Sequence, residues 1–140
     1  MISYATLEEL CLRYGDNTVL QLTDLERRGQ INADIAQQAL LDATAEIDGY
    51  LNRYTRPFPQ IPRLLTVYCC DIAIYRLATG MRQGNDDMDT RYKNAIDYLK
   101  QVARGTATIS GLPENGQLGT GDTVMFNQPQ QKVFGRDRPY

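Results

Sequence analysis

The chain of 140 residues is long enough for one domain with its own hydrophobic core and a tail. Its formal net charge of -2 and isoelectric point near 5.1 provide no overall basic field, which argues against a free-standing nucleic-acid-binding protein. Because the chain contains no histidine, it lacks the commonest general base and metal ligand, and we expect neither an enzyme nor a metal or cofactor site.

Two capping-box signatures near the N-terminus predict two short helices. The first, TLEE, begins at Thr6 and predicts a helix that ends before Gly15. The second, TDLE, begins at Thr23 and predicts one or two helical turns that end at Gly29. The residues between them, 17–22, are compatible with either helix or loop.

A long helix is predicted to start after Asn32, a favourable N-cap residue. Its apolar residues recur at intervals of three and four: Ile35, Ala36, Ala39, Leu40, Ala43, Ile47, Tyr50, Leu51 and Tyr54. Gly49 lies inside this pattern and costs about 1 kcal/mol relative to alanine. We therefore expect another helix to approach closely at Gly49.

The next element is the most apolar part of the chain. Prolines within residues 57–62 are expected to end the long helix, and residues 62–80 then form a helix with almost no polar face. Pro62 suits the first helical position, and Gly80 suits a left-handed cap beyond the end. A helix that is apolar on every side is normally buried on every side, so we expect it to be the central helix of the fold.

Asp71 and Arg76 interrupt the apolar run of this central helix. The uninterrupted part is shorter than the roughly 20 residues that cross a bilayer, so we expect no membrane span.

The last helix is predicted between Gly105 and the polar segment 81–89, whose acidic residues are expected at the helix start. One apolar stripe runs along it: Met88, Tyr92, Ala95, Ile96, Leu99, Val102 and Ala103. From residue 106 the chain becomes rich in glycine and glutamine and loses helical periodicity, which indicates an extended arm. Two short segments of the arm, 123–126 and 131–134, are compatible with a short hairpin.

These patterns predict an all-α fold: a small helical bundle of two short N-terminal helices and three longer ones. We expect a helical domain over residues 1–105 and a mostly irregular C-terminal arm over residues 106–140. The arm has too little apolar content to fold alone, so it would become ordered by docking on a partner.

The three cysteines are odd in number, lack CxxC spacing and include two in the central helix, so we expect buried thiols in a reducing compartment. The N-terminus, MISYATLEEL, has neither a basic start nor an apolar signal core. We expect a protein made in a cytoplasm and kept there until it is assembled.

Few residues suggest catalysis. Asp71, or the pair Glu46 and Asp48, is a candidate for acid–base chemistry if burial raises a carboxyl pKa. We expect instead that Asp71 pairs with Arg76, a tyrosine hydroxyl or a helix end. The acidic segment 85–89 lacks the spacing of a calcium loop and is better interpreted as a solvated helix start.

Two further patterns concern partners. The short helices before the long one suggest a helix-turn-helix DNA-binding regulator, yet the long helix begins with Asp34, Gln37 and Gln38, which are not basic. Arg53, Arg56 and Arg63 surround the proline segment. This cluster is compatible with an interface to an acidic partner and equally with a solvated surface.

Several blocks of the chain resemble the Mu-type phage and prophage small virion protein family. They are YATL (4–7), LTD (22–24), AEIDGYL (45–51), CDIAIYRL (70–77), RYKNAIDYL (91–99) and VARG (102–105). The resemblance covers about residues 1–105, and the blocks occur in the same order.

The resemblance implies a structural, all-α subunit of the phage head–tail connector, or adaptor, group. Such a protein would form a homo-oligomeric ring, expected as a dodecamer, beneath the portal protein in the virion neck. The ring would extend the DNA channel and receive a tail-proximal stopper or tail-terminator protein, with DNA only as non-specific cargo. The resemblance also implies that the arm makes intermolecular contacts through Phe126, Phe134, Arg136 and Tyr140.

Overall fold

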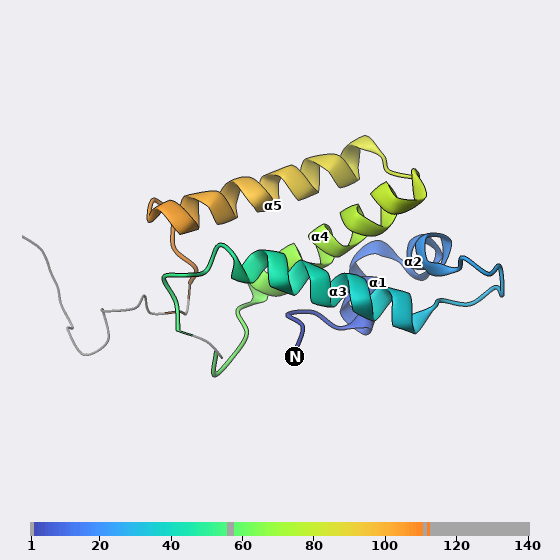
Figure 1. Cartoon of the computed structure of the whole chain (residues 1–140), viewed down its shortest axis with the longest axis horizontal. Helices are drawn as coiled ribbons and strands as arrows, with labels where there is room; N and C mark the ends of the chain where they lie inside the picture. The colour runs from blue at the N-terminus through green and yellow to red at the C-terminus, as the bar shows by residue number, and fades with distance from the viewer. Residues whose placement is uncertain (1, 56–57, 111, 113–140) are drawn as a thin grey trace, which may run out of the picture.

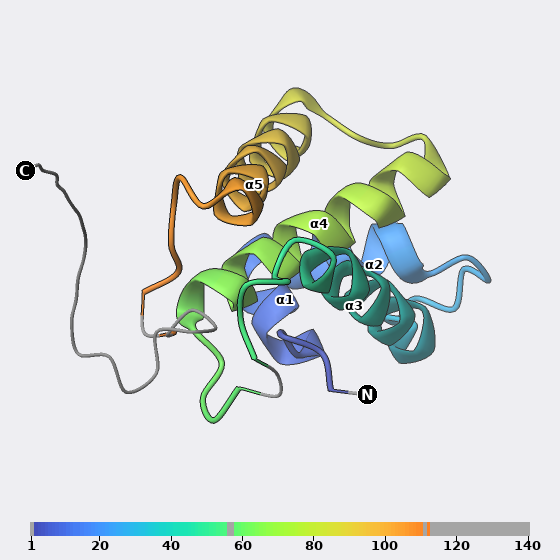
Figure 2. The same cartoon turned by 60° about the vertical axis from the view of Figure 1, so that its left-hand side comes forward.

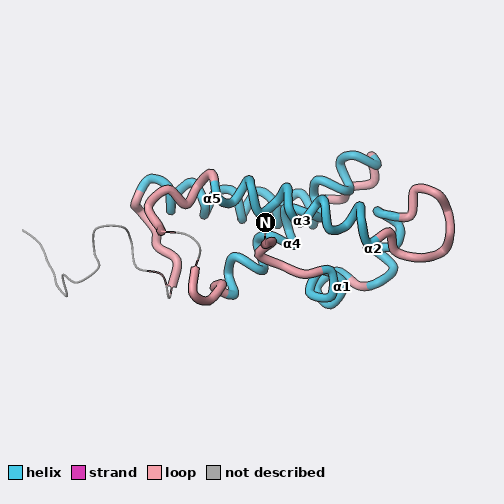
Figure 3. The backbone as a smooth tube through the Cα atoms, turned by 60° about the horizontal axis from the view of Figure 1, so that its bottom comes forward, coloured by secondary structure: helices cyan, strands magenta, loops and turns pink. Residues whose placement is uncertain are grey.

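The computed structural model describes residues 2–55, 58–110 and 112, and these contain helices and loops but no strand (Figures 1 and 3). The five helices are α1 (Leu7–Tyr14), α2 (Asp16–Thr23), α3 (Ala33–Asp48), α4 (Arg63–Met81) and α5 (Asp86–Arg104). The predicted all-α bundle of two short and three longer helices is confirmed. The possible hairpin of the arm lies outside the described residues, and the boundary at residue 105 stays a prediction.

The predicted capping box starts α1. The Thr6 hydroxyl accepts a hydrogen bond from the Glu9 backbone N–H, and the Glu9 carboxylate accepts one from the Thr6 N–H. The helix ends at Gly15, whose φ of 90° favours glycine, as the sequence predicted.

The prediction for the second short helix was wrong in position. The helix occupies Asp16–Thr23, so Thr23 closes it instead of opening one. The Thr23 hydroxyl donates to the Val19 carbonyl and accepts from the Asn32 N–H, which is a tertiary contact. Residues 24–32 form a projecting loop, because the Asp24 carboxylate accepts hydrogen bonds from the N–H groups of Arg28 and Gly29.

Helix α3 begins as predicted, with the Asn32 side chain accepting from the N–H groups of Asp34 and Ile35. It ends earlier than predicted, at Asp48. Gly49 follows as the C-cap, and a Cβ atom added there would meet only the backbone carbonyls of α3 itself. The expected close approach of another helix at Gly49 was therefore wrong.

The central position of α4 is confirmed. All four other helices pack against it (Figures 1 and 2). Nine of its 19 residues are buried: Leu65, Thr66, Cys69, Cys70, Asp71, Ile72, Ala73, Ile74 and Ala78.

The ends of α4 differ slightly from the prediction. Pro62 is the N-cap and Arg63 the first helical residue, whereas Gly80 lies within the helix. The left-handed cap residue is Arg82, with φ of 57°. Gly80 does not end the helix because the hydrogen bonds continue one further turn, to Arg82 and Gln83.

By length and composition alone, α4 also meets the criterion for a membrane-spanning helix, as core helices of soluble proteins do. Half of its most apolar stretch is buried inside the protein. The four helices packed around α4 therefore account for its apolar character as a core helix.

Helix α5 packs on α4 through the predicted stripe, with Met88, Ala95, Ile96, Leu99 and Val102 buried; Ala103 is exposed, contrary to the prediction. Two tyrosine pairs join the helices, with ring centroids 3.8 Å apart for Tyr75 and Tyr92 and 5.9 Å apart for Tyr68 and Tyr98. Gly105 caps α5 in the left-handed conformation. The contact with α4 is thus largely apolar and aromatic.

The first residues after α5 fold back on the body. The Tyr98 hydroxyl donates to the Thr108 carbonyl at 2.6 Å, and the Ile109 N–H donates to the Tyr54 hydroxyl at 3.1 Å. Ile109 is 1% exposed and belongs to the hydrophobic core. The described start of the predicted arm is therefore part of the packed structure.

Candidate partner-binding groove

A hollow of about 260 Å³ lies along the side of α4 that faces α1, with one residue contributed by α5. We call it the basic groove, and its lining is Glu9, Leu12, Arg13, Arg63, Thr66, Val67, Cys70 and Arg91. Three of these residues are arginines and one is a glutamate. The lining therefore combines these four charged residues with the apolar Leu12, Val67 and Cys70.

The apolar part of the groove follows from the pattern of α1. Leu10 is completely buried, so this face of α1 points into the core. Leu12 lies on the opposite side of the helix and is 86% exposed, which is unusual for a leucine in a short helix. The half-buried Val67 and the buried Cys70, one helical turn apart on α4, continue the apolar surface.

Arg13 is fixed by a buried carboxylate. Its Nε and Nη2 atoms donate to Oδ1 and Oδ2 of Asp71 at 2.9 and 3.2 Å. The Tyr14 hydroxyl donates to the same carboxylate at 2.6 Å. Asp71 is 4% exposed, and these charge-assisted hydrogen bonds compensate for its burial.

These contacts alter the ionisation of the groups around the groove. The hydrogen bond to Asp71 raises the pKa of Arg13, and burial raises the pKa of the Tyr14 phenol. Burial also raises the pKa of Cys70 to about 12, so this thiol stays protonated near neutral pH. Arg13 therefore keeps its positive charge beside the groove, and Cys70 provides no reactive thiolate there.

The other two arginines are more exposed. Arg63 has an 82% exposed side chain and approaches Glu9 Oε2 only at 4.0 Å. Arg91 donates to the exposed Asp87, and its guanidinium lies 5.2 Å from the centre of the Tyr14 ring. Exposed pairs of this kind contribute little to stability, which leaves Arg63 in particular available to another molecule.

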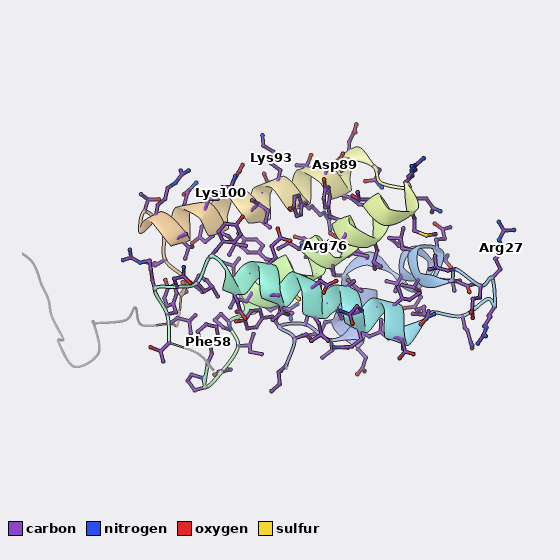
Figure 4. All side chains as sticks on the ribbon, in the orientation of Figure 1. Arg27, Phe58, Arg76, Asp89, Lys93 and Lys100 are labelled. Carbon is purple, nitrogen blue, oxygen red and sulfur yellow. The ribbon has the colours of Figure 1, made fainter. Side chains whose placement is uncertain are left out.

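The carboxylates considered for catalysis have structural partners. The expected pairing of Asp71 with a tyrosine hydroxyl is confirmed, but Arg76 is not its partner. Arg76 instead donates to Glu46 at 2.7 Å, and Figure 4 shows it on α4 beside α3. Tyr92 donates to the same Glu46 carboxylate at 3.0 Å, so this group joins α3, α4 and α5.

Asp48 accepts a hydrogen bond from the Tyr4 hydroxyl. In the part of the chain that the structure describes, no cluster of three histidine, cysteine or acidic residues could hold a metal ion.

Two arginines of the predicted cluster, Arg53 and Arg63, contact different parts of the structure. Arg53, in the loop after α3, lies beside Gly105 at the end of α5, whereas Arg63 starts α4 beside α1. Arg56 lies outside the described residues. So do the arm residues proposed for intermolecular contacts: Phe126, Phe134, Arg136 and Tyr140.

Of the predicted residues, only Arg63 lines the groove. Leu12, Arg13 and Arg91 were not predicted to belong to a site. The exposure of Leu12 could have been predicted from the sequence, because Leu12 lies outside the apolar stripe of α1 that Leu7, Leu10 and Tyr14 form. The position of Arg91 beside α1 depends on tertiary packing and has no local signal.

A family model and two known proteins match this chain, and all three come from Mu-type phages or prophages. The family model described as "Bacteriophage Mu, Gp36" matches residues 4–127. The chain is 31% identical over 137 residues to gene product J of Escherichia phage Mu, covering 96% of each chain. It is 30% identical over 138 residues to the Mu-like prophage FluMu protein gp36 of Haemophilus influenzae, covering 98% of this chain and 96% of that protein.

The family match covers most of the chain, and both relatives align over almost their full length. The resemblance inferred from the sequence blocks to a Mu-type phage family is thereby confirmed. The chain belongs to the bacteriophage Mu Gp36 family and is a protein of phage origin.

Proposed function

We propose that this protein is a structural subunit of the phage virion, in a head–tail connector (adaptor) ring in the neck. The observation that carries the proposal is its membership, over residues 4–127, of a family named for bacteriophage Mu. The subunit would be made in the host bacterial cytoplasm, dock beneath the portal protein and provide the attachment point for a stopper or tail-terminator protein.

The charge of the chain supports a conduit for DNA. A protein with net charge -2 has no general attraction for phosphate. Strong phosphate binding would create salt-dependent friction in a channel through which DNA must slide. In this proposal DNA is cargo only, and the ring has no catalytic or cofactor function.

The regulator alternative is less consistent with the fold. Helix-turn-helix motifs join their helices by about 3–4 residues, whereas α2 and α3 are joined by the loop 24–32. Asp34, Gln37 and Gln38 are exposed at the start of α3, where a recognition helix would contact DNA bases.

A nonsense allele of the gene in an inducible phage tests the proposal. We expect DNA-filled heads and separate tails that do not join, because packaging precedes the missing connection. Expression of the unaltered gene in trans should restore complete particles, and cryo-electron microscopy of the neck should place the protein there as a ring. Normal particles from the nonsense allele, or salt-sensitive binding of the protein to duplex DNA, would contradict the proposal.

The arm residues need a separate test. Deletion from residue 106 would also remove the buried Ile109, so substitutions are cleaner. Phe126→Ala and Phe134→Ala are expected to weaken attachment to portal-bearing heads while the helical content of the protein stays unchanged. Ser110→Ala, at an exposed position, serves as the control. Unchanged attachment by both phenylalanine variants would refute a role of the arm.

A further inference from the structure

We propose that residues 106–112 form a strap that fixes the point at which the C-terminal arm leaves the helical body, with Tyr54 and Tyr98 as its positioning residues. This inference rests on the proposed function, in which the arm contacts another protein, and it names the contacts that direct the arm. The structure describes residues 106–110 and 112 of the strap.

The strap begins with a sharp reversal of the chain after α5. Gly105 lies in the left-handed region, with φ of 86°. The N–H groups of Thr106 and Ala107 both donate to the Gln101 carbonyl, at 2.9 and 3.3 Å. The Thr106 hydroxyl donates to the same carbonyl at 3.1 Å. These bonds close the end of the helix and turn the chain away from the axis of α5.

Two tyrosines from different parts of the body hold the strap. The Tyr98 hydroxyl, from α5, donates to the Thr108 carbonyl at 2.6 Å. The Tyr54 hydroxyl, in the loop after α3, accepts from the Ile109 N–H at 3.1 Å. Because Tyr54 and Ile109 are 55 positions apart, this second bond joins the strap to a part of the chain other than the helix that precedes it.

One side of the strap is buried against the body. Ile109 is 1% exposed, and the partly buried Ala107 and Leu112 pack against the same core. Thr108 and Ser110, on either side of Ile109, are exposed. This alternation is typical of an extended segment with one face on the core, and burial of the apolar face favours the closed strap.

The loop after α3 also contacts the residue that precedes the strap. A Cβ atom added to Gly105 would lie 2.6 Å from Arg53 Nη1 and 3.1 Å from its Cζ, so the guanidinium lies directly against the Gly105 backbone. Arg53 and Tyr54 are neighbours in this loop, where the Tyr54 N–H donates to the Leu51 carbonyl at 3.1 Å. The same loop therefore holds both the beginning and the middle of the strap.

These contacts place the root of the arm at one end of the molecule. Figure 1 shows the strap running from the end of α5 toward the loop after α3, at the end opposite the α2–α3 loop. Every residue after 112 is therefore tethered at this end. Because the strap is already fixed, it does not have to be ordered when the arm binds, and such preorganisation lowers the entropic cost of binding.

Hydrogen exchange of the full-length chain tests the strap. The Ile109 amide is expected to exchange as slowly as amides in the middle of α5, because it is buried and hydrogen-bonded. Tyr54→Phe keeps the ring but removes the acceptor, so exchange at Ile109 should become about tenfold faster while amides in the middle of α4 stay protected. Tyr50→Phe removes a hydroxyl elsewhere in the same loop and is the matched control, with unchanged exchange at Ile109.

Attachment to portal-bearing heads tests what the strap does for the arm. The double variant Tyr54→Phe/Tyr98→Phe leaves every residue of the arm in place but loosens its root. Its attachment is expected to weaken about fivefold, because the strap must then be ordered on binding, while its helical content stays unchanged. Tyr50→Phe should attach normally.

Four results would overturn the inference. They are fast exchange at Ile109 in the unaltered chain, unchanged exchange there in Tyr54→Phe, equally faster exchange throughout α4 in that variant, and normal attachment by a double variant whose strap exchanges freely. A strap that exchanges as expected, in a protein that never attaches to heads, would preserve the strap and refute the proposed function.

Discussion

Arg13 in α1 and Asp71 in α4 are 58 positions apart in the sequence and are joined by two hydrogen bonds, of 2.9 and 3.2 Å. Asp71 is 4% exposed, so its charge depends on Arg13 and Tyr14 for compensation. The contact also holds α1 against the central helix, on the side where the basic groove lies.

Arg13→Ala is therefore expected to lower the free energy of unfolding by about 3 kcal/mol, because it leaves a buried carboxylate with one partner. Urea denaturation measures the change. Arg28→Ala, which removes an exposed pair with Glu26, should cost less than about 0.5 kcal/mol. Adding Asp71→Asn to Arg13→Ala should recover part of the loss, and a double variant with no recovery would show that the buried charge is not its cause.

Two glycines should respond in opposite directions to alanine. Gly105 has φ of 86°, and an added Cβ would lie 2.6 Å from Arg53 Nη1, so Gly105→Ala should destabilise by about 1–2 kcal/mol. Gly80 lies in α4 with nothing within 4 Å of the added atom, so Gly80→Ala should stabilise by about 0.5–1 kcal/mol. The urea midpoint should fall for Gly105→Ala and rise for Gly80→Ala. A shift in the same direction for both variants would contradict the different backbone roles of the two glycines.

The thiols should differ in reactivity. Burial raises the pKa of all three thiols, but Cys69 and Cys70 are buried from solvent, whereas Cys11 is only half-buried. With a chromogenic disulfide reagent at mildly alkaline pH, Cys11 should react first and the other two only as fast as the protein unfolds. In denaturant all three should react quickly. Rapid modification of Cys70 in the native protein would show that its burial has been misjudged.

Stability should fall at high pH partly because of Tyr92. Its pKa is raised to about 12, first by burial and then by the hydrogen bond to Glu46, whereas an unfolded tyrosine titrates near about 10. Between these values the unfolded state has released its proton and the native state has kept it, so the free energy of unfolding decreases as pH rises. Tyr92→Phe should flatten this decrease in urea denaturation across that pH range, and an unchanged slope would exclude Tyr92 as a contributor.

Local signals predicted most of the fold. The cap of α1 at Thr6, the cap of α3 at Asn32 and the ends of α5 depend on residues within a few positions of each other, and all were found as expected. The apolar run of α4 predicted its central place for the same reason, because burial on every side requires apolar residues on every side.

The errors and omissions have tertiary causes. The TDLE signature at Thr23 failed because the hydroxyl of Thr23 bonds to Asn32 across the loop. The basic groove could not be predicted, since Leu12, Arg13 and Arg91 come from helices whose packing no local pattern specifies. For Asp71 the sequence predicted a tyrosine hydroxyl as a possible partner, but it did not identify Arg13, which belongs to another helix.

The stacked rings of Tyr75 and Tyr92 provide an intrinsic optical reporter for the contact between α4 and α5. The chain contains nine tyrosines and no tryptophan, so no indole absorption obscures their near-ultraviolet signal. Two parallel rings 3.8 Å apart couple electronically and should contribute a circular dichroism band that a separated pair lacks. Loss of this band, while far-ultraviolet helicity is retained, would reveal detachment of α5 during folding or assembly without any attached label.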